Sequence, residues 1–333
     1  MRLLILGGTR FVGPHVVGEL LDDGHDVAVF HRGETENTFT TGAHHIHGDL
    51  ADFERYLSEL RSLEPEVVVD LRAFRREEGR RVLAFRDVAG RGVVASSADV
   101  YRAFGRLHRT EPGPPDPLPL TEESPLREVV ISEDYDKVGV EEEAQAEPDF
   151  PVTVLRLPAI HGPGDYQHRL YKYVKRIDDE RPAILLDAAV AGWRWVRGYV
   201  EDVAHAIALA AIDDSTAGRV YNVADPEAFT EEEWVRRIAR VVGWAGQIIA
   251  APAPELPPGL QQADKFDLRQ DFAVDSSRIR SELGYSERVD ADEALRRTIE
   301  WERANPPETL DSAEWDYAAE DAVVARLALR TSD

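Results

Sequence analysis

The sequence predicts an α/β protein built on a doubly wound parallel sheet, with a smaller α/β domain towards its C-terminus. Two observations support this prediction. Short apolar runs alternate with amphipathic segments of helix length through the first half of the chain, and the first run leads directly into a glycine turn. Strands that are separated by helices of this length need right-handed crossovers, which place parallel strands in one sheet with helices on both faces.

Six apolar runs, each bounded by glycine, proline or polar residues, are the expected strands of this sheet. They are Arg2–Leu6, Asp26–His31, His44–His47, Glu66–Asp70, Gly92–Ser96 and Val152–Leu157. Helical spacing of apolar side chains predicts helices at about residues 11–21, 52–63, 77–89 and 133–146.

Beyond Leu157 the alternation becomes irregular. Helices are expected at Gln167–Asp179, Val200–Ile212, Thr230–Val242 and about Asp292–Ala304, and strands at Ala183–Leu186 and Val220–Val223. We therefore expect a first domain of residues 1–157, a mixed region of residues 158–310 interleaved with the last strands of the sheet, and a helical extension over residues 311–333.

Composition excludes several classes of protein. The 333 residues include 63 Asp+Glu against 39 Lys+Arg, and the net charge of −24 disfavours binding to nucleic acid or to an anionic membrane surface. Because cysteine is absent, disulfide frameworks, thiolate nucleophiles and Cys-ligated metals are excluded. The first apolar run is too short for a signal peptide, and no window approaches 18 uninterrupted apolar residues, so we expect a cytoplasmic chain.

Lysine is unusually scarce. It occurs only at positions 137, 172, 175 and 265, so that 35 of the 39 basic residues are arginine. High acidity with few lysines is typical of halophilic proteins, whose repelling carboxylates are screened by salt. The alternative is an ordinary acidic protein encoded by a GC-rich genome, which also prefers arginine codons.

The first strand runs into Gly7-Gly8-Thr9-Arg10-Phe11-Val12-Gly13, which opens the first helix. Gly7 permits a tight turn and Gly13 allows close packing of helix on strand, while the N–H groups of the helix N-terminus attract a pyrophosphate. A glycine cluster in this strand–turn–helix setting predicts a dinucleotide site. A purely structural turn is the alternative.

Further short motifs follow the other expected strands. They are Gly48-Asp49-Leu50, the segments 96–101, 156–158, 162–165 and 199–204, and Tyr221-Asn222-Val223. With the glycine loop they make residues 1–307 resemble the short-chain dehydrogenase/reductase superfamily, in its extended and atypical branches named NAD-dependent epimerase/dehydratase. The loop itself is similar to a subgroup related to chloroplast stem-loop-binding proteins, although typical members have a third glycine where this chain has Arg10. The resemblance implies a Rossmann-type NAD(P)-binding domain capped by a substrate-binding region.

The end of the second strand predicts which cofactor binds. A carboxylate there would accept a hydrogen bond from the ribose of NAD, whereas arginine accommodates the extra phosphate of NADP. This chain has His31-Arg32, and Arg10 adds a second cation, so NADP is preferred over NAD. Alternatively, Arg32 is solvated, Arg10 bonds its own loop or packs over the adenine, and NAD is acceptable. Asp49, by analogy with the family, contacts the adenine, and Leu50, Asp70, Leu71 and Pro158 complete the predicted cofactor site.

The resemblance also implies a catalytic group. Its serine is Ser97 and its tyrosine is Tyr135, but the lysine expected four residues after the tyrosine is replaced by Gly139. Lys137 lies two residues after Tyr135, which on a helix turns it about 200° away. Lys137 could therefore act only if the helix begins after Tyr135. The alternative role for Tyr135 is to pack against, or hydrogen-bond to, a bound cofactor.

Three side chains are expected at the substrate. Arg72 follows the fourth strand, His161 follows the sixth, and Arg197 matches a region that contacts the sugar nucleotide in the resembled enzymes. Asp165 and His168 stand nearby, but the spacing of His161 and His168 is poor for a metal site, and none is predicted.

These features predict an NAD(P)-dependent epimerase/dehydratase or oxidoreductase that acts on a nucleotide sugar, or on a similar alcohol or carbonyl substrate, by reversible hydride transfer. The alternative is a catalytically reduced protein on the same scaffold that senses a dinucleotide or associates with RNA. A homodimer is a possible assembly, and no membrane partner is expected.

Salt should stabilise the protein if its acidity is an adaptation to salt. The Debye length falls from about 30 Å at 0.01 M salt to about 3 Å at 1 M, so that molar salt screens the repulsion among carboxylates. We expect the melting temperature to be higher in about 2 M KCl than in about 0.05 M KCl. An unchanged melting temperature would leave the acidity as a neutral feature of composition.

Overall fold

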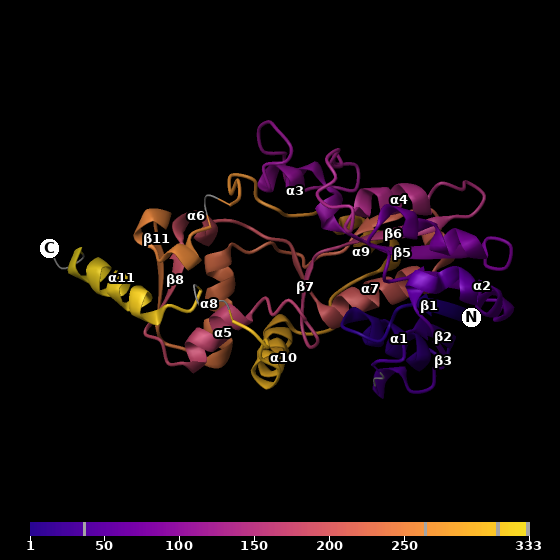
Figure 1. Ribbon diagram of the computed structural model, residues 1–333, viewed down its shortest axis with the longest axis horizontal. Coiled ribbons are helices and arrows are strands. Elements are labelled where there is room, and N and C mark those ends of the chain that lie inside the picture. Colours follow the sequence, from indigo (N-terminus) through magenta and orange to yellow (C-terminus); the bar gives the residue numbers. More distant parts are fainter. Residues whose placement is uncertain (36–37, 263–264, 311–313, 331–333) are drawn as a thin grey trace.

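The structure is a computed structural model that describes residues 1–35, 38–262, 265–310 and 314–330. Within these residues a seven-stranded parallel sheet forms the larger lobe (Figure 1). Its order is β10-β6-β5-β4-β1-β2-β3, with β1 (Arg2–Leu6), β2 (Asp26–His31), β3 (His44–His47), β4 (Val67–Asp70), β5 (Arg91–Ser97), β6 (Val152–Leu157) and β10 (Val220–Asn222). The strand order reverses between β1 and β4, which is where open α/β sheets bind ligands. The predicted fold class is confirmed.

Helices cover both faces of the sheet. The helices α1 (Val12–Asp22) and α7 (Val200–Ile212) lie on one face, and α2 (Phe53–Ser62), the 3₁₀ helix η3 (Arg76–Phe85) and α4 (Lys137–Ala144) lie on the other. Alternate side chains of β1 enter the two cores, because Leu3 and Ile5 pack on the first face whereas Leu4 and Leu6 pack on the second. Both faces of the sheet are therefore buried, as expected for strands that are continuous apolar runs.

The smaller lobe is built around a short parallel pair, β8 (Ala183–Asp187) and β11 (Gln247–Ala251). Its helices are α5 (Tyr171–Asp178), α6 (Ala188–Ala191), α8 (Glu231–Val242), α10 (Ala291–Ala304) and α11 (Tyr317–Arg330). A second parallel pair, β7 (Ala159–His161) with β9 (Arg197–Tyr199), runs between the lobes, and α3 (Arg102–Leu107) and α9 (Ser277–Leu283) complete the chain (Figure 1). Because α7 and β10 return to the large sheet, the chain crosses between the lobes more than once.

Several local predictions need correction. The helix expected at 77–89 is a 3₁₀ helix that ends at Phe85, and the helix expected from Gln167 begins at Tyr171. The helix expected over 133–146 begins only at Lys137, because the side chain of Asp136 accepts a hydrogen bond from the backbone of Gly139 and so caps the helix there. The strand β11 and the β7–β9 pair were not predicted.

The predicted extension over residues 311–333 contains α11, although 311–313 and 331–333 lie outside the described residues. No helix in the described part of the chain is both long enough and apolar enough to cross a membrane.

Candidate functional site

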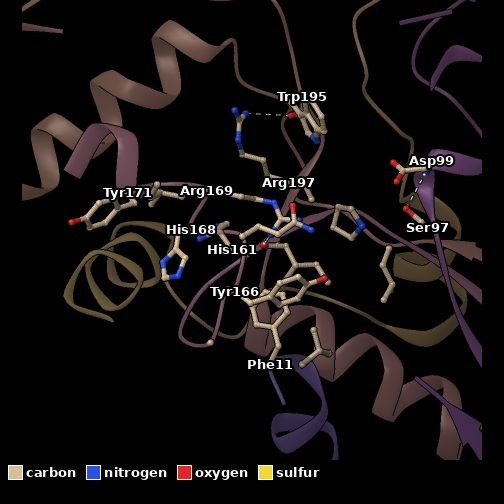
Figure 2. A pocket seen from close by; sticks show the side chains of 18 of the residues that line it. Phe11, Ser97, Asp99, His161, Tyr166, His168, Arg169, Tyr171, Trp195 and Arg197 are labelled. Carbon is tan, nitrogen blue, oxygen red and sulfur yellow. Dashed lines mark hydrogen bonds between the residues drawn. The ribbon is translucent and has the colours of Figure 1, made fainter. Parts of the chain in front are cut away.

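A large cavity of about 1780 Å³ extends from the glycine turn after β1 into the smaller lobe. Cavities for drug-sized ligands occupy roughly 300–1,000 Å³, so this one has room for more than one small molecule. All of the predicted site residues line it except Asp70. Figure 2 shows Ser97 and Asp99 at one side of the cavity, Tyr171 at the other, and Arg169 and Arg197 between them.

The glycine loop forms a cradle that side chains would fill. Gly7 and Gly8 have φ values of 94° and 102°, which favour glycine, and a Cβ on Gly13 would lie 2.3 Å from the Cα of Gly8. No described side chain caps α1, and its first turn has no acidic residue. The positive end of the helix dipole therefore faces a loop without side-chain bulk, an arrangement that fits a pyrophosphate.

Beside this cradle, Arg10 and Arg32 share one carboxylate. The Nη2 atoms of Arg10 and Arg32 lie 3.2 Å and 2.8 Å from Oε2 of Glu34, and all three side chains are about half exposed. Arg10 therefore bonds to Glu34 rather than to its own loop. The cluster carries one net positive charge at the rim of the cavity.

Residues that follow β3 and β4 lie beside the glycine cradle or hold its neighbours in place. Asp49 lines the cavity, and its Oδ1 accepts a hydrogen bond from the N–H of Ala51 at 2.9 Å. Arg72 also lines the cavity and packs against the glycine turn, since a Cβ on Gly7 would lie 2.6 Å from its Cγ. Asp70 instead is fully buried, and its Oδ1 accepts a hydrogen bond from the N–H of Arg72 at 2.7 Å. Its carboxylate therefore holds the chain that carries Arg72.

The tyrosine predicted to be catalytic is paired with a carboxylate that the sequence analysis did not single out. The hydroxyl of Tyr135 donates a hydrogen bond to Oδ2 of Asp99 at 2.9 Å, and the N–H of Asp99 donates to Oγ of Ser97 at 3.2 Å. All three residues line the cavity. Burial raises the pKa of Asp99 above its ordinary value, and burial followed by the charge of Asp99 raises the pKa of Tyr135.

Lys137, the first residue of α4, lines the same part of the cavity as Tyr135. Its Nζ donates hydrogen bonds to the carbonyl oxygens of Ala73 at 2.6 Å and Ala95 at 2.9 Å, and it lies 4.5 Å from the centre of the Phe74 ring. The Phe74 ring in turn stacks on Tyr135, with 6.3 Å between ring centroids. Burial lowers the pKa of Lys137 to about 8, although nearby carboxylates oppose the shift.

The position of α4 corrects the argument from helical spacing. Tyr135 precedes the helix, so the 200° separation from Lys137 does not apply. Position 139 points elsewhere, because a Cβ on Gly139 would lie 2.3 Å from Oδ2 of Asp136 and 2.7 Å from Cγ of Arg76. A lysine at position 139 would disturb the helix cap rather than enter the cavity.

Further from the sheet, two cations share a buried carboxylate. Glu231 accepts hydrogen bonds from Arg197 and from the hydroxyl of Tyr173, and its Oε1 lies 3.4 Å from Nζ of Lys172. Burial alone would raise the pKa of Glu231, but Lys172 and then Arg197 lower it to about 2. This part of the cavity therefore carries two positive charges and one negative charge around neutral pH.

His161 and His168 are held by neighbours. Nδ1 of His161 is 3.0 Å from Oγ1 of Thr298, and burial followed by the charge of Arg197 lowers the pKa of His161 to about 3, so its ring stays neutral. Nδ1 of His168 lies 2.8 Å from Oε2 of the buried Glu302. Asp165 is fully buried and bonds to Arg169 at 2.6 Å. All three side chains are therefore held by hydrogen bonds within the fold.

The scarcity of lysine is a signal in the sequence that marks both the predicted Lys137 and the missed Lys172. In a chain with four lysines, Lys137 and Lys172 both line the cavity, and Lys175 stands beside it on α5. Where arginine is otherwise used throughout, a retained lysine indicates a position that needs a compact ammonium group. No such signal identifies Asp99 or Glu231, since acidic residues are abundant.

Residues 3–224 match the NAD dependent epimerase/dehydratase family, a span that includes most of the seven-stranded sheet and the Ser97, Tyr135 and Lys137 group. The chain belongs to this family. As a member, it is similar to chloroplast stem-loop binding protein of 41 kDa b from Arabidopsis thaliana, with 23% identity over 308 residues that cover 88% of this chain and 77% of the relative.

Two solved structures show how far the likeness of fold extends. The Bordetella bronchiseptica enzyme WbmG, in complex with NAD, is 19% identical with a TM-score of 0.68, over 92% of this chain and 94% of that chain. UDP-glucose 4-epimerase from Thermotoga maritima, with UDP-glucose, is 19% identical with a TM-score of 0.66, over 91% of this chain and 99% of that chain. Both lobes of this family member therefore follow a known architecture.

Proposed function

We propose that this protein is an NAD(P)-dependent oxidoreductase of the epimerase/dehydratase kind, acting on a nucleotide sugar by reversible hydride transfer. One observation carries the proposal: one cavity brings together a pyrophosphate cradle, the Ser97, Tyr135 and Lys137 group, and a cationic far side. The relatives support it, because the WbmG structure holds NAD and the Thermotoga epimerase structure holds UDP-glucose. Arg72, His161 and Arg197 are the proposed substrate contacts.

The charge of the cavity supports an anionic ligand. The chain as a whole carries −24, yet among the described residues eight basic and six acidic side chains line the cavity. The cavity therefore has a local excess of cations in a protein that is otherwise rich in carboxylates. A dinucleotide together with a diphosphate-linked sugar would supply matching negative charges.

A bound nicotinamide dinucleotide would supply the hydride acceptor, and the residues of this chain would handle the proton. Ser97 and Tyr135 line the cavity and would hydrogen-bond to the reacting hydroxyl, and the Tyr135 hydroxyl donates a hydrogen bond to Asp99 at 2.9 Å. As the alcohol is oxidised, its O–H proton passes to the Tyr135 oxygen while the proton of Tyr135 passes to Asp99. Because the pKa of Tyr135 is raised, a relay that avoids a free phenolate is favoured.

Tyr135→Phe should reduce turnover by a factor of about 10² to 10⁴, the usual contribution of a positioned acid or base, and leave cofactor affinity nearly unchanged. Asp99→Asn should cause a similar loss if the relay operates. Tyr56→Phe is the matched control, since Tyr56 does not line the cavity, although its ring packs on Phe30, which does. The measurement is absorbance of reduced cofactor with a panel of nucleotide sugars. Full activity of the Tyr135→Phe variant would make Tyr135 structural.

The pH profile of kcat/KM in the oxidative direction should have two limbs. Activity should rise with pH as Asp99 loses its proton and becomes able to accept one, above the ordinary range of an aspartate because its pKa is raised. It should fall again near pH 8, where Lys137 loses its charge. Lys137→Arg should move the basic limb to higher pH, because arginine stays protonated. A basic limb that does not move would exclude Lys137 as its source.

The finer proposal on the cofactor is a preference for NADP. Arg32→Asp should lower the ratio of NADPH to NADH affinity, because it removes a cation and adds a repelling carboxylate. Glu34→Gln should raise the same ratio, since it releases Arg10 and Arg32 from their shared partner. All three side chains are exposed, so changes of several-fold are expected by calorimetry. Equal changes for both cofactors would contradict the proposal.

The turnover assay also tests the alternative, in which the chain senses a dinucleotide or associates with RNA. Tight cofactor binding without hydride transfer to or from any sugar nucleotide would favour that alternative. The net charge of −24 argues against RNA as the partner.

A further inference from the structure

The far end of the cavity is lined by residues that follow α10 and lie beyond the span matched to the family. Its lining residues there are Pro307, Thr309, Leu310, Glu314 and Trp315, which follow α10 and precede α11. The family match ends at residue 224. This wall therefore lies beyond the span that the family model matches.

A buried ion pair fixes the position of the segment. The guanidinium of Arg176, on α5, lies 2.6 Å from Oε1 of Glu320 on α11, and both side chains are almost fully buried. The Nη2 of Arg176 also donates a hydrogen bond to the carbonyl of Glu314 at 2.6 Å. A buried pair contributes little net stability after desolvation, but separating its two partners would leave a buried charge unpaired. Arg176 thus sets where the neighbouring Trp315 stands.

Apolar packing also holds α11 in place. Val323 of α11 is buried in a cluster with Leu185, Ala251 and Leu256, which belong to β8, β11 and the loop after β11. The helix therefore docks on the short sheet of the smaller lobe, and Figure 1 shows it at that end of the molecule. The wall is a packed part of the fold.

Trp315 gives the wall an aromatic and cationic surface. Its ring lies 4.6 Å from the guanidinium carbon of Arg176 and 5.6 Å from Nζ of Lys175, and its centroid is 6.1 Å from that of Tyr171. Trp315, Tyr171 and Arg176 all line the cavity. Aromatic surfaces of this kind bind the flat face of a base and tolerate different bases.

The order in which the reacting groups, the cations and the aromatic surface of Trp315 lie along the cavity indicates which part of the substrate would contact Trp315. The hydroxyl that reacts belongs beside Ser97 and Tyr135 at one end, and the cations Lys172 and Arg197 lie further along, where a diphosphate would be neutralised. Figure 2 shows Tyr171 on the opposite side of Arg197 from Ser97. The part of a nucleotide sugar beyond its diphosphate is the nucleoside.

We propose that Trp315 and Tyr171 form a subsite for the nucleobase, so that the C-terminal segment makes the nucleoside a requirement for tight binding. This inference rests on the proposed function, because it assumes a substrate with a nucleoside diphosphate. It adds a specificity-determining residue, Trp315, that acts far from the reacting groups.

Calorimetry on the full chain tests the subsite with UDP, dTDP, GDP, ADP and inorganic pyrophosphate as probes. Trp315→Ala should weaken the best of the four nucleotides by roughly 10-fold, as loss of a stacking ring does, and leave pyrophosphate affinity unchanged. Trp315→Phe should retain part of the affinity. Tyr317→Phe is the control on the same segment, since Tyr317 bonds to Asp179 and does not line the cavity.

The outcomes separate this inference from the function on which it rests. If the wild type binds a nucleotide and Trp315→Ala binds it equally well, the subsite is wrong and the function stands. If the wild type binds none of the four nucleotides, both are overturned. NAD and NADP titrations show whether each variant is folded. Should Trp315→Ala fail to fold, fluorescence decides: nucleotide should quench the wild type more than Trp315→Phe, and equal quenching would overturn the subsite.

Discussion

The reversal of strand order between β1 and β4 is the constraint on which the site depends. All seven strands are parallel, so their carboxyl ends meet at one edge of the sheet, and the reversal leaves a crevice there because the chains on its two sides leave in opposite directions. The glycine turn after β1, the loop with Arg72 after β4, and Ser97 at the end of β5 all reach this edge. Chemistry-bearing residues that are far apart in sequence are thereby gathered by the topology of the sheet itself.

Within that frame, one hydrogen bond decides which lysine faces the cavity. Asp136 caps α4 through the N–H of Gly139, so the helix begins at Lys137 and Tyr135 remains in the preceding loop. The capped first turn directs Lys137 under the carboxyl ends of β4 and β5, where backbone oxygens of Ala73 and Ala95 accept its protons. Glycine at position 139 is needed for the same reason, since any side chain there would press on the cap and on Arg76.

The sequence predicted the larger lobe well, because its signals are local. Each buried strand is a continuous apolar run, and the glycine turn stands at the end of the first. The errors arise where tertiary contacts override local patterns. The segment at 76–85 has helical spacing but packs so closely on α4 that a Cβ on Gly79 would lie 2.3 Å from the carbonyl oxygen of Val140, and it forms a 3₁₀ helix. The partnership of Tyr135 with Asp99, 36 residues apart, leaves no trace in either segment alone.

The charged residues on the far side of the cavity could not be predicted from the sequence, and the reason is electrostatic. Acidic side chains are so common in this chain that Glu231 resembles any surface carboxylate, although it is almost fully buried between cations. Its charge must be balanced locally, because the low dielectric of the interior makes an unpaired carboxylate costly. Lys172 and Arg197 supply that balance and exceed it by one charge, while the solvated carboxylates outside are screened over a Debye length. A protein of strongly negative net charge can thus present a cationic cavity to an anionic ligand. The field of the surface carboxylates is screened by salt over a Debye length, whereas the cations inside the cavity act directly on a ligand that they contact.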